Sequence, residues 1–153
     1  MRGVLKAYGV ADRKVWVADS FEGLPAPVSS FDGADLSGVK YLKVSLAQVK
    51  SNFERFGLLD DQVRFLKGYF RDTLPHAPIE RLSVLRLDGD LYSSTMDALR
   101  SLYARVSRGG YVIVDDYYSW APCRQAVDEF LSEQLRKPQI EPIDWAGAYW
   151  RVP

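Results

Sequence analysis

The chain has 153 residues, enough for one domain that buries roughly two-thirds of its unfolded surface. Its 47% hydrophobic and 13% aromatic residues exclude an intrinsically disordered chain, and its 20 basic and 20 acidic residues balance to a net charge of zero. This balance argues against an electrostatic affinity for nucleic acid or for anionic membranes. No apolar run reaches the length of a transmembrane helix, and the single cysteine favours a reducing, cytoplasmic setting.

The N-terminal part predicts a short helix, a strand and a long loop. Residues Met1–Tyr8 have a helical pattern, which Gly9 would end as a C-terminal cap. The apolar residues after it predict a buried strand over Val15–Asp19. The following segment, Ser20–Val39, is rich in glycine, proline and serine. A loop of that length is typical of a lid or binding loop, and a merely disordered connection is the alternative.

The next stretch alternates helix and strand. Ser45 and Gln48 form a capping-box pattern, and apolar residues at helical spacing follow until Gly57. Residues Val63–Leu66 predict a second strand, which Gly68 ends. The sequence therefore predicts a strand, a helix and a second strand in the first half of the chain.

The second half continues the alternation. A connection containing prolines, 72–80, leads to a predicted strand over Leu82–Leu87. A helix is expected from Ser94 or Thr95 to the pair Gly109-Gly110, with a buried face made by Met96, Leu99, Leu102, Tyr103 and Val106.

The C-terminal part predicts one more strand, a helix and a hairpin. The strand covers Tyr111–Val114, and the helix begins beyond Pro122 with an apolar side made by Val127, Phe130 and Leu131. The tail, Ile140–Pro153, reads as a hairpin, in which Trp145, Tyr149 and Trp150 serve for packing.

Strands alternating with helices predict an α/β fold, with a mostly parallel sheet and an antiparallel edge from the C-terminal hairpin. In such sheets, ligands bind at the carboxyl ends of the strands. Four predicted strands end in small or acidic residues, namely Asp19, Gly68, Asp88 and Asp115. We therefore expect a functional site at this edge of the sheet.

Two acidic clusters, Asp88-Gly89-Asp90 and Asp115-Asp116, follow strands that a helical crossover makes parallel. Such a crossover brings the carboxylates to one rim, where a cation or a proton must relieve their repulsion. Carboxylate oxygens suit Mg²⁺ or Mn²⁺, and zinc is disfavoured because His76 and Cys123 are the only imidazole and thiol. The alternative is that these aspartates only cap helices and turns, above all Asp90.

Three further residues have weaker signals. Asp19 after a hydrophobic strand is typical of the acid that binds ribose hydroxyls in nucleotide-binding α/β folds, although turn chemistry explains it equally well. His76 lies among prolines and is interpreted as a loop residue. Cys123 lies near a helix start, where a thiol pKa can fall, but no histidine is near it in sequence, and it is interpreted as structural.

Three segments in this order and spacing resemble the macrocin O-methyltransferase family: Val15–Pro25, Leu85–Thr95 and Gly109–Tyr117, with a weaker match at Cys123–Val127. The resemblance covers nearly the whole chain. It implies a Rossmann-like class I methyltransferase fold, with residues 1–153 as a single, partial domain. It also implies an enzyme that uses S-adenosylmethionine and Mg²⁺ to methylate a deoxysugar hydroxyl of a macrolide or related natural product, such as an aminocoumarin.

The resemblance assigns roles by position. It implies that Asp88, Asp115 and Asp116 hold the metal, and that Asp90 is the general base on the sugar hydroxyl. The remaining implied positions contact S-adenosylmethionine: Asp19, Ser20, Phe21, Gly68, Phe70 and Asp88. These roles are chemically coherent, since a bound Mg²⁺ lowers the pKa of a hydroxyl and a nearby carboxylate can take its proton.

The chain departs from the family pattern at its N-terminus. Class I methyltransferases begin their cofactor site with a strand and a glycine-rich turn, whereas this chain starts within the helix that would follow, and no Gly-x-Gly pattern precedes Val4. We expect a truncated sequence or a start-site error rather than a natural remnant. Without the first strand, two inner sheet edges would be unpaired, so the chain alone should be poorly stable or form a homo-oligomer.

Two other functions fit parts of the sequence. The Asp-x-Asp pattern of Asp88 and Asp90 also occurs in metal-dependent phosphoryl-transfer enzymes and glycosyltransferases. The phosphatases with this pattern have Thr or Val two residues beyond the second aspartate, whereas this chain has Tyr92 there. A non-catalytic remnant of a methyltransferase is the second alternative. The absent glycine-rich turn favours it, and the intact acidic clusters argue against it.

Overall fold

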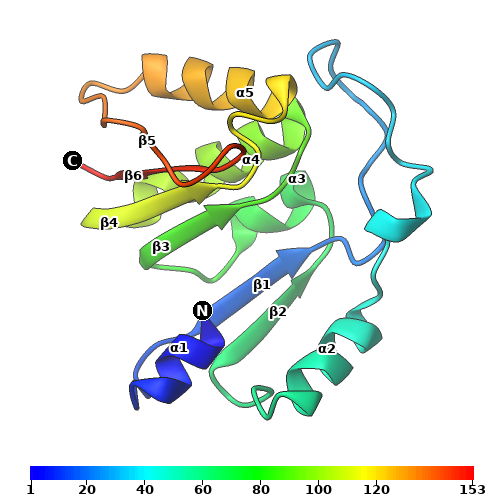
Figure 1. Cartoon of the computed structure of the whole chain (residues 1–153), viewed down its shortest axis with the longest axis vertical. Coiled ribbons are helices and arrows are strands. Elements are labelled where there is room, and N and C mark those ends of the chain that lie inside the picture. The colour runs from blue at the N-terminus through cyan, green and yellow to red at the C-terminus, as the bar shows by residue number, and fades with distance from the viewer.

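The computed structural model describes residues 1–153, and its six strands and five helices form an α/β fold with a divided sheet (Figure 1). The strands are β1 (Val15–Asp19), β2 (Val63–Lys67), β3 (Leu82–Leu87), β4 (Val106–Val114), β5 (Glu141–Pro142) and β6 (Ala148–Arg151). The helices are α1 (Arg2–Ala7), α2 (Leu46–Arg55), α3 (Phe70–Thr73), α4 (Tyr92–Leu102) and α5 (Ala121–Ser132), and 3₁₀ turns cover Lys40–Leu42, Leu74–His76 and Tyr103–Arg105. No helix combines the length and the apolar character that crossing a membrane requires.

The strands form two separate sheets. The smaller sheet is the parallel pair β1–β2, and the larger one has the order β3-β4-β6-β5. Strands β3 and β4 are parallel, whereas β6 runs antiparallel to both β4 and β5. The predicted α/β fold, mostly parallel with an antiparallel C-terminal hairpin, is confirmed. Since no strand pairs β1 with β3, each of these two strands has one free edge.

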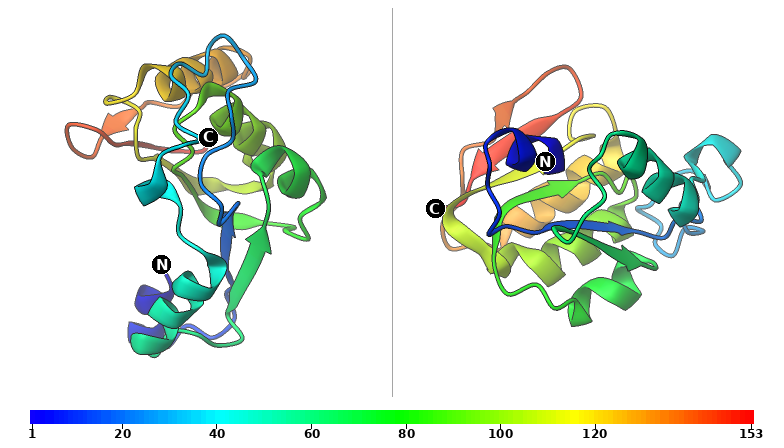
Figure 2. Two further views of the ribbon diagram at one scale, coloured as in Figure 1. Left: turned by 90° about the vertical axis from the view of Figure 1, so that its right-hand side faces the viewer. Right: turned by 90° about the horizontal axis from the view of Figure 1, so that it is seen from below.

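The hydrophobic core lies between the larger sheet and helices α4 and α5. Val112 on β4 and Trp150 on β6 face each other across the ladder, and both are fully buried. The predicted apolar faces of the two helices contribute to this core through Met96, Leu99, Leu102, Val127, Phe130 and Leu131. Helices α1 and α2 lie instead beside the smaller sheet (Figures 1 and 2). The two sheets therefore differ in how well they are covered.

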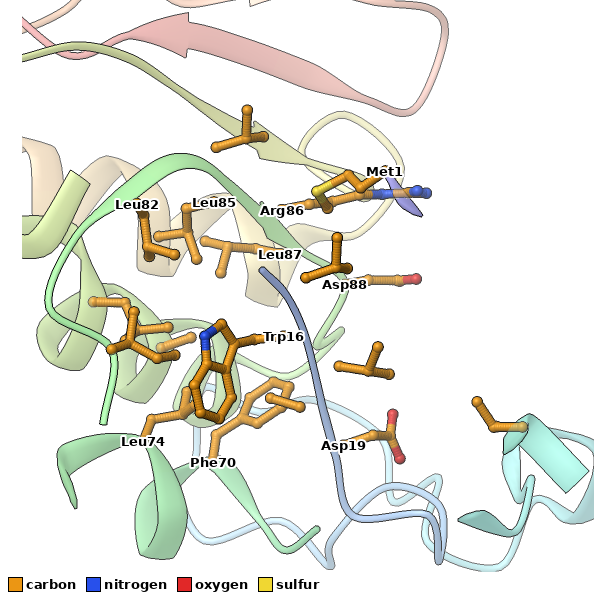
Figure 3. Close-up of a pocket in the computed structure, with 18 of the residues that line it drawn as sticks. Met1, Trp16, Asp19, Phe70, Leu74, Leu82, Leu85, Arg86, Leu87 and Asp88 are labelled. Atoms are coloured by element: carbon orange, nitrogen blue, oxygen red, sulfur yellow. The ribbon is translucent and has the colours of Figure 1, made fainter. Parts of the chain in front are cut away.

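A cleft of about 530 Å³ separates β1 from β3, and 19 of its 24 lining residues are hydrophobic. Figure 3 shows Trp16 of β1 opposite Leu85 and Leu87 of β3, with Asp19 and Asp88 at one end. Two parallel strands with free edges thus border an apolar space. This arrangement agrees with the expected absence of a first strand from the sheet, because that strand would lie between β1 and β3.

The expected end of the central helix was wrong. Helix α4 runs from Tyr92 to Leu102, and Gly109-Gly110 lie inside β4. Gly109 has φ +80°, and a Cβ on Gly110 would lie 2.8 Å from the carbonyl oxygens of both Ser83 and Ser107. The two glycines therefore form an irregularity where β3 and β4 shift register and approach closely.

Two other boundaries also differ from the expectations. Helix α4 begins at Tyr92 rather than at Ser94 or Thr95, and the connection 72–80 contains the end of α3 and a 3₁₀ turn. The capping pattern before α2 was correct in part, because the Ser45 hydroxyl accepts the Gln48 N–H at 3.2 Å. The Gln48 side chain bonds to Asn52 instead of returning to Ser45, so only half of a capping box forms.

Candidate active site

The ends of β3 and β4 bring three carboxylates together. Asp88 follows β3 directly, Asp90 lies two residues further on, and Asp116 lies two residues beyond β4. One oxygen of each lies within 4.8 Å of the others. The backbone fixes this juxtaposition, since the Asp115 N–H donates to the Leu87 carbonyl at 3.0 Å and so extends the β3–β4 ladder. The structure thus groups Asp88, Asp90 and Asp116 at the carboxyl edge of the sheet.

Asp115 is held differently from its neighbour. Its carboxylate forms a two-pronged ion pair with the Arg86 guanidinium, with Nε 3.0 Å from both oxygens and one terminal nitrogen 2.5 Å from Oδ2. The Asp115 charge is therefore neutralised by Arg86 rather than directed into the three-acid group. A role for Arg86 was not predicted from the sequence. The only indication is that it is a single charged residue inside the apolar run Leu82–Leu87.

Two acids in the group have raised pKa values. Partial burial is the main cause for both, and Asp116 adds to each. The pKa of Asp88 rises although Arg86 acts against the rise, and the pKa of Asp90 rises to about 6. This clustering of unrelieved negative charge is the arrangement that a divalent cation would stabilise.

The backbone at Asp90 is strained. Its φ is +53°, a left-handed conformation that costs a non-glycine residue roughly 1–2 kcal/mol. The Leu91 N–H donates to the Gly89 carbonyl at 2.6 Å and closes a tight turn around Asp90. The Leu91 side chain, which is fully buried, anchors the other end of this turn. Strain of this kind is found at functional sites, where the surrounding structure holds it in place.

The turn after β1 is also tightly bonded. The Asp19 carboxylate accepts the Phe21 N–H at 2.5 Å through one oxygen, and its other oxygen has no protein donor. The Ser20 hydroxyl donates to the Gly23 carbonyl at 2.6 Å and accepts the Glu22 N–H at 3.0 Å. Phe21 has φ +56° and a side chain that is only 5% exposed. The turn therefore leaves one Asp19 oxygen free for a ligand.

Gly68 and Phe70 connect the smaller sheet to the acidic group. Gly68 ends β2 with φ +141°, and a Cβ there would lie only 2.6 Å from the Thr73 methyl group, so a side chain is excluded. Phe70 begins α3, and its ring edge lies 3.3 Å from where a Cβ of Gly89 would be. Phe70 thus packs against the turn between Asp88 and Asp90.

A pocket of about 190 Å³ lies between the turn after β1 and the turn formed by residues 88–90. Its lining comprises Asp19, Ser20, Gly23, Leu24, Pro25, Leu42, Tyr69, Phe70, Asp88, Gly89, Asp90 and Ser94. Of the residues predicted to contact a cofactor, Asp19, Ser20, Phe70 and Asp88 line it, Phe21 lines the neighbouring cleft, and Gly68 lines neither. The volume is below the roughly 300–1,000 Å³ usual for ligand pockets, so this pocket suits part of a cofactor-sized molecule.

The two residues interpreted as non-catalytic differ in exposure. His76 is exposed in a 3₁₀ turn. Cys123 is 2% exposed, and burial raises the pKa of its thiol to about 12. A thiol in that state is not a nucleophile at neutral pH.

Comparison with known proteins decides the family. The model of the macrocin O-methyltransferase family, TylF, matches residues 1–152. The chain belongs to this family. Its members are S-adenosylmethionine-dependent O-methyltransferases, as the resemblance of the three segments implied.

Two curated members of the macrocin O-methyltransferase family illustrate the similarity. The chain is 52% identical over 158 residues to mycinamicin III 3''-O-methyltransferase of Micromonospora griseorubida, covering 98% of this chain and 61% of that protein. It is 50% identical over 156 residues to demethyldecarbamoylnovobiocin O-methyltransferase of Streptomyces niveus, covering 99% of this chain and 60% of that protein. The chain therefore spans about 60% of the length of these relatives.

The structural comparison agrees with the sequence. The solved structure of the O-methyltransferase NovP superposes with a TM-score of 0.97 at 50% identity, covering 99% of this chain and 65% of that one. The divided sheet therefore has the same architecture as the matching part of the NovP structure.

Proposed function

We propose that residues 1–153 form one partial methyltransferase domain that carries the metal-binding and base half of a sugar O-methyltransferase site. The reaction would move a methyl group from S-adenosylmethionine to a deoxysugar hydroxyl of a glycosylated, macrolide-type natural product, in the cytoplasm. The observation that supports this most is the group of three carboxylates within 4.8 Å, which borders the pocket containing Asp19. The family assignment favours this function over the Asp-x-Asp phosphoryl- and glycosyl-transfer alternative.

The acidic group fits a divalent cation. Asp88 and Asp116 offer hard oxygens from two adjacent strand ends, and burial together with the neighbouring acids raises the pKa of Asp88. Asp115 would complete the ligand set by turning away from Arg86. When bound there, Mg²⁺ would supply Lewis acidity that lowers the pKa of a sugar hydroxyl.

The β1 turn fits the ribose side of S-adenosylmethionine. The free oxygen of Asp19 can accept hydrogen bonds from a vicinal diol, and the tight turn through Ser20 fixes its direction. Phe70 supplies an apolar surface beside it, and the side-chain-free Gly68 lets the chain turn sharply from β2 into α3. When bound, S-adenosylmethionine would supply a methyl group on a positively charged sulfur.

Asp90 would act as the general base. In the metal-free chain, burial and the neighbouring carboxylates raise its pKa to about 6, so it is ionised at neutral pH and can accept a proton. The sugar oxygen would form the new bond to the methyl carbon as the bond from that carbon to sulfur breaks. The hydroxyl proton would pass to Asp90, and the sulfur would keep the electrons of the broken bond as a neutral thioether. The left-handed turn at Asp90, closed by the bond from the Leu91 N–H to the Gly89 carbonyl, would hold the carboxylate in place for such a transfer.

A fusion protein tests this proposed function, because the chain spans only about 60% of the length of its relatives. Any residues that precede the matched region in the Streptomyces niveus relative, which is 50% identical over the match, would be fused to the N-terminus of this chain. The fusion would be assayed for S-adenosylhomocysteine release with that relative's demethylated acceptor and with glycosylated macrolides, in Mg²⁺ and in EDTA. We expect turnover that requires Mg²⁺ and falls at least 100-fold in Asp90→Asn.

The matched control is Asp12→Asn, which removes the same charge from an exposed residue in the loop before β1. It should keep the wild-type rate. Turnover that survives in EDTA would exclude the metal role, and turnover that survives in Asp90→Asn would exclude the base. A folded fusion without turnover on any acceptor would favour the non-catalytic remnant instead.

A further inference from the structure

The loop after β1 contains the only acidic residue that is fully buried. Asp32 is 0% exposed, although the residues on both sides of it, Phe31 and Gly33, are exposed. A carboxylate at such a position is costly unless its oxygens are hydrogen-bonded. Its contacts therefore indicate what the position does.

The two oxygens of Asp32 bond to different parts of the chain. Oδ2 accepts the N–H groups of Val28 and Ser29, both at 2.9 Å, and so closes the loop on itself. Oδ1 accepts the N–H of Ser93 at 2.7 Å, 61 residues further along the chain. One carboxylate thus joins the long loop to the first turn of α4.

The first turn of α4 needs such a partner. The residue before the helix, Leu91, supplies no side-chain cap, so the N–H groups at the helix start depend on groups from elsewhere. Asp32 provides a negatively charged acceptor at this end, which the helix dipole also favours. Burial alone raises the pKa of Asp32, but its backbone donors outweigh burial, and the pKa lies below the usual range.

Asp90, in its left-handed conformation, lies two residues before the first residue of α4. The chain from Asp90 to Ser93 is short, and the carboxylate of Asp32 fixes its far end, while the Leu91 N–H bond to Gly89 closes its near end. Two side-chain contacts support the same junction. The Phe31 and Tyr92 rings lie 5.2 Å apart, and Gly33 lies against Pro122 at the start of α5.

We propose that Asp32 is a positioning residue for Asp90: by binding Ser93 and the loop together, it holds the strained turn and the loop wall of the pocket in one arrangement. Residues Gly23, Leu24 and Pro25 of the same loop line the pocket together with Asp90, so Asp32 links the loop that forms part of the pocket wall to the segment that follows Asp90. The inference rests on the proposed role of Asp90 as the base.

Asp32→Asn is the informative change. An amide keeps the size of the carboxylate, but its nitrogen cannot accept a hydrogen bond, so either Ser93 or the loop loses its acceptor. Asp35→Asn is the matched control, because Asp35 lies in the same loop, is exposed and accepts only the local Ser37 N–H. Asp32→Ala removes both sets of bonds, and Asp32→Asn remains available if that variant does not fold.

The first measurement is hydrogen–deuterium exchange on the 153-residue chain. We expect Asp32→Asn to raise exchange at least tenfold in 28–32 and in 91–94 together, while β3 and β4 keep their protection. The affinity of the chain for Mg²⁺ should change less than threefold, since Asp88 and Asp116 are fixed by strands rather than by the loop. Unchanged exchange in 91–94 overturns the proposal.

The second measurement is steady-state kinetics of the fusion enzyme. We expect Asp32→Asn to lower kcat at least tenfold with the KM for S-adenosylmethionine within threefold, and Asp35→Asn to match the wild type. An unchanged kcat, or an equal loss in Asp35→Asn, overturns the positioning role. If the wild-type fusion transfers no methyl group, the proposed function fails, and the linkage by Asp32 is then decided by exchange alone.

Discussion

The charge cluster predicts that Asp90→Asn makes the metal-free chain more stable while removing the proposed base. Asparagine suits this position for two reasons. It has nearly the size of aspartate, and it is among the few residues that tolerate a φ near +53°. The substitution therefore changes the charge and leaves the turn intact, so any change in the free energy of unfolding reports the electrostatics of the acidic group.

The magnitude follows from the pKa of Asp90, which is about 6 against an ordinary 3.8. A folded state with a raised carboxyl pKa binds the proton more tightly than the unfolded state does. The stability of the wild type therefore falls as the pH rises from about 4 to about 6, and above pH 6 the full penalty applies. At 1.36 kcal/mol per pKa unit, this shift lowers the free energy of unfolding of the wild type by at most about 3 kcal/mol. Asp90→Asn lacks it.

Urea unfolding in EDTA, followed by tryptophan fluorescence, measures the difference. At pH 8 we expect Asp90→Asn to be more stable than the wild type by up to about 3 kcal/mol, and at pH 4 the two should be nearly equal. Adding Mg²⁺ at pH 8 should reduce this difference in the free energy of unfolding, because a bound cation stabilises the grouped carboxylates of the wild type. Asp12→Asn, which makes the same change in net charge at an exposed residue, should show no such dependence.

Two outcomes would contradict this prediction. If Asp90→Asn were no more stable than the wild type at pH 8 in EDTA, neither burial nor the neighbouring carboxylates would destabilise the ionised Asp90 in the folded chain. If the gain were the same at pH 4 and pH 8, its origin would be packing rather than charge. In either case the raised pKa could not support the role of Asp90 as a base.

Three further predictions test the rest of the structure. Asp88→Asn and Asp116→Asn should each weaken Mn²⁺ binding at least tenfold by calorimetry, because both carboxylates belong to the three-acid group; unchanged affinity in both would place the cation elsewhere. The 153-residue chain should self-associate in sedimentation, and fusing the N-terminal segment of a relative should give a monomer with a higher Tm, since β1 and β3 have free edges; a stable monomer without the segment would contradict this. Gly110→Ala should destabilise the fold by about 2 kcal/mol or more in urea unfolding, because its Cβ would lie 2.8 Å from two carbonyl oxygens, whereas Gly38→Ala, in open space, should cost little.

Local rules were enough to predict the acidic edge of the sheet. An apolar run followed by an acid marks a strand end, and a helical crossover makes consecutive strands parallel. Those two statements place Asp88 and Asp116 at one edge without any long-range information, and the structure has them there. Which aspartates share a group was harder to predict, because the direction of the Asp115 side chain depends on Arg86.

Other features could not be read from local patterns. The pair Gly109-Gly110 matches a helix end in sequence, yet it lies within β4, where the backbone of β3 approaches too closely for any side chain. Asp32 was one polar residue in a loop rich in glycine, proline and serine, and its significance depends on Ser93, 61 residues away. Contacts of this length leave no periodic signal in a single sequence.

The proposed cofactor pocket joins the two sheets, and this has a consequence for binding. Asp19 lies on the smaller sheet and Asp88 on the larger one, at the same end of the cleft between them (Figure 3). No ladder joins β1 to β3, so these two acids are connected by loops, by the packing of α3 against α4, and by β1 side chains such as Trp16 that pack against the core. Binding one molecule across both acids must therefore also fix the spacing of the sheets, which costs affinity. Pairing a strand into the cleft would set that spacing beforehand. The fusion should accordingly bind S-adenosylmethionine at least tenfold more tightly than the 153-residue chain does, even in Asp90→Asn, and equal affinities in calorimetry would show that the two sheets are already held in register.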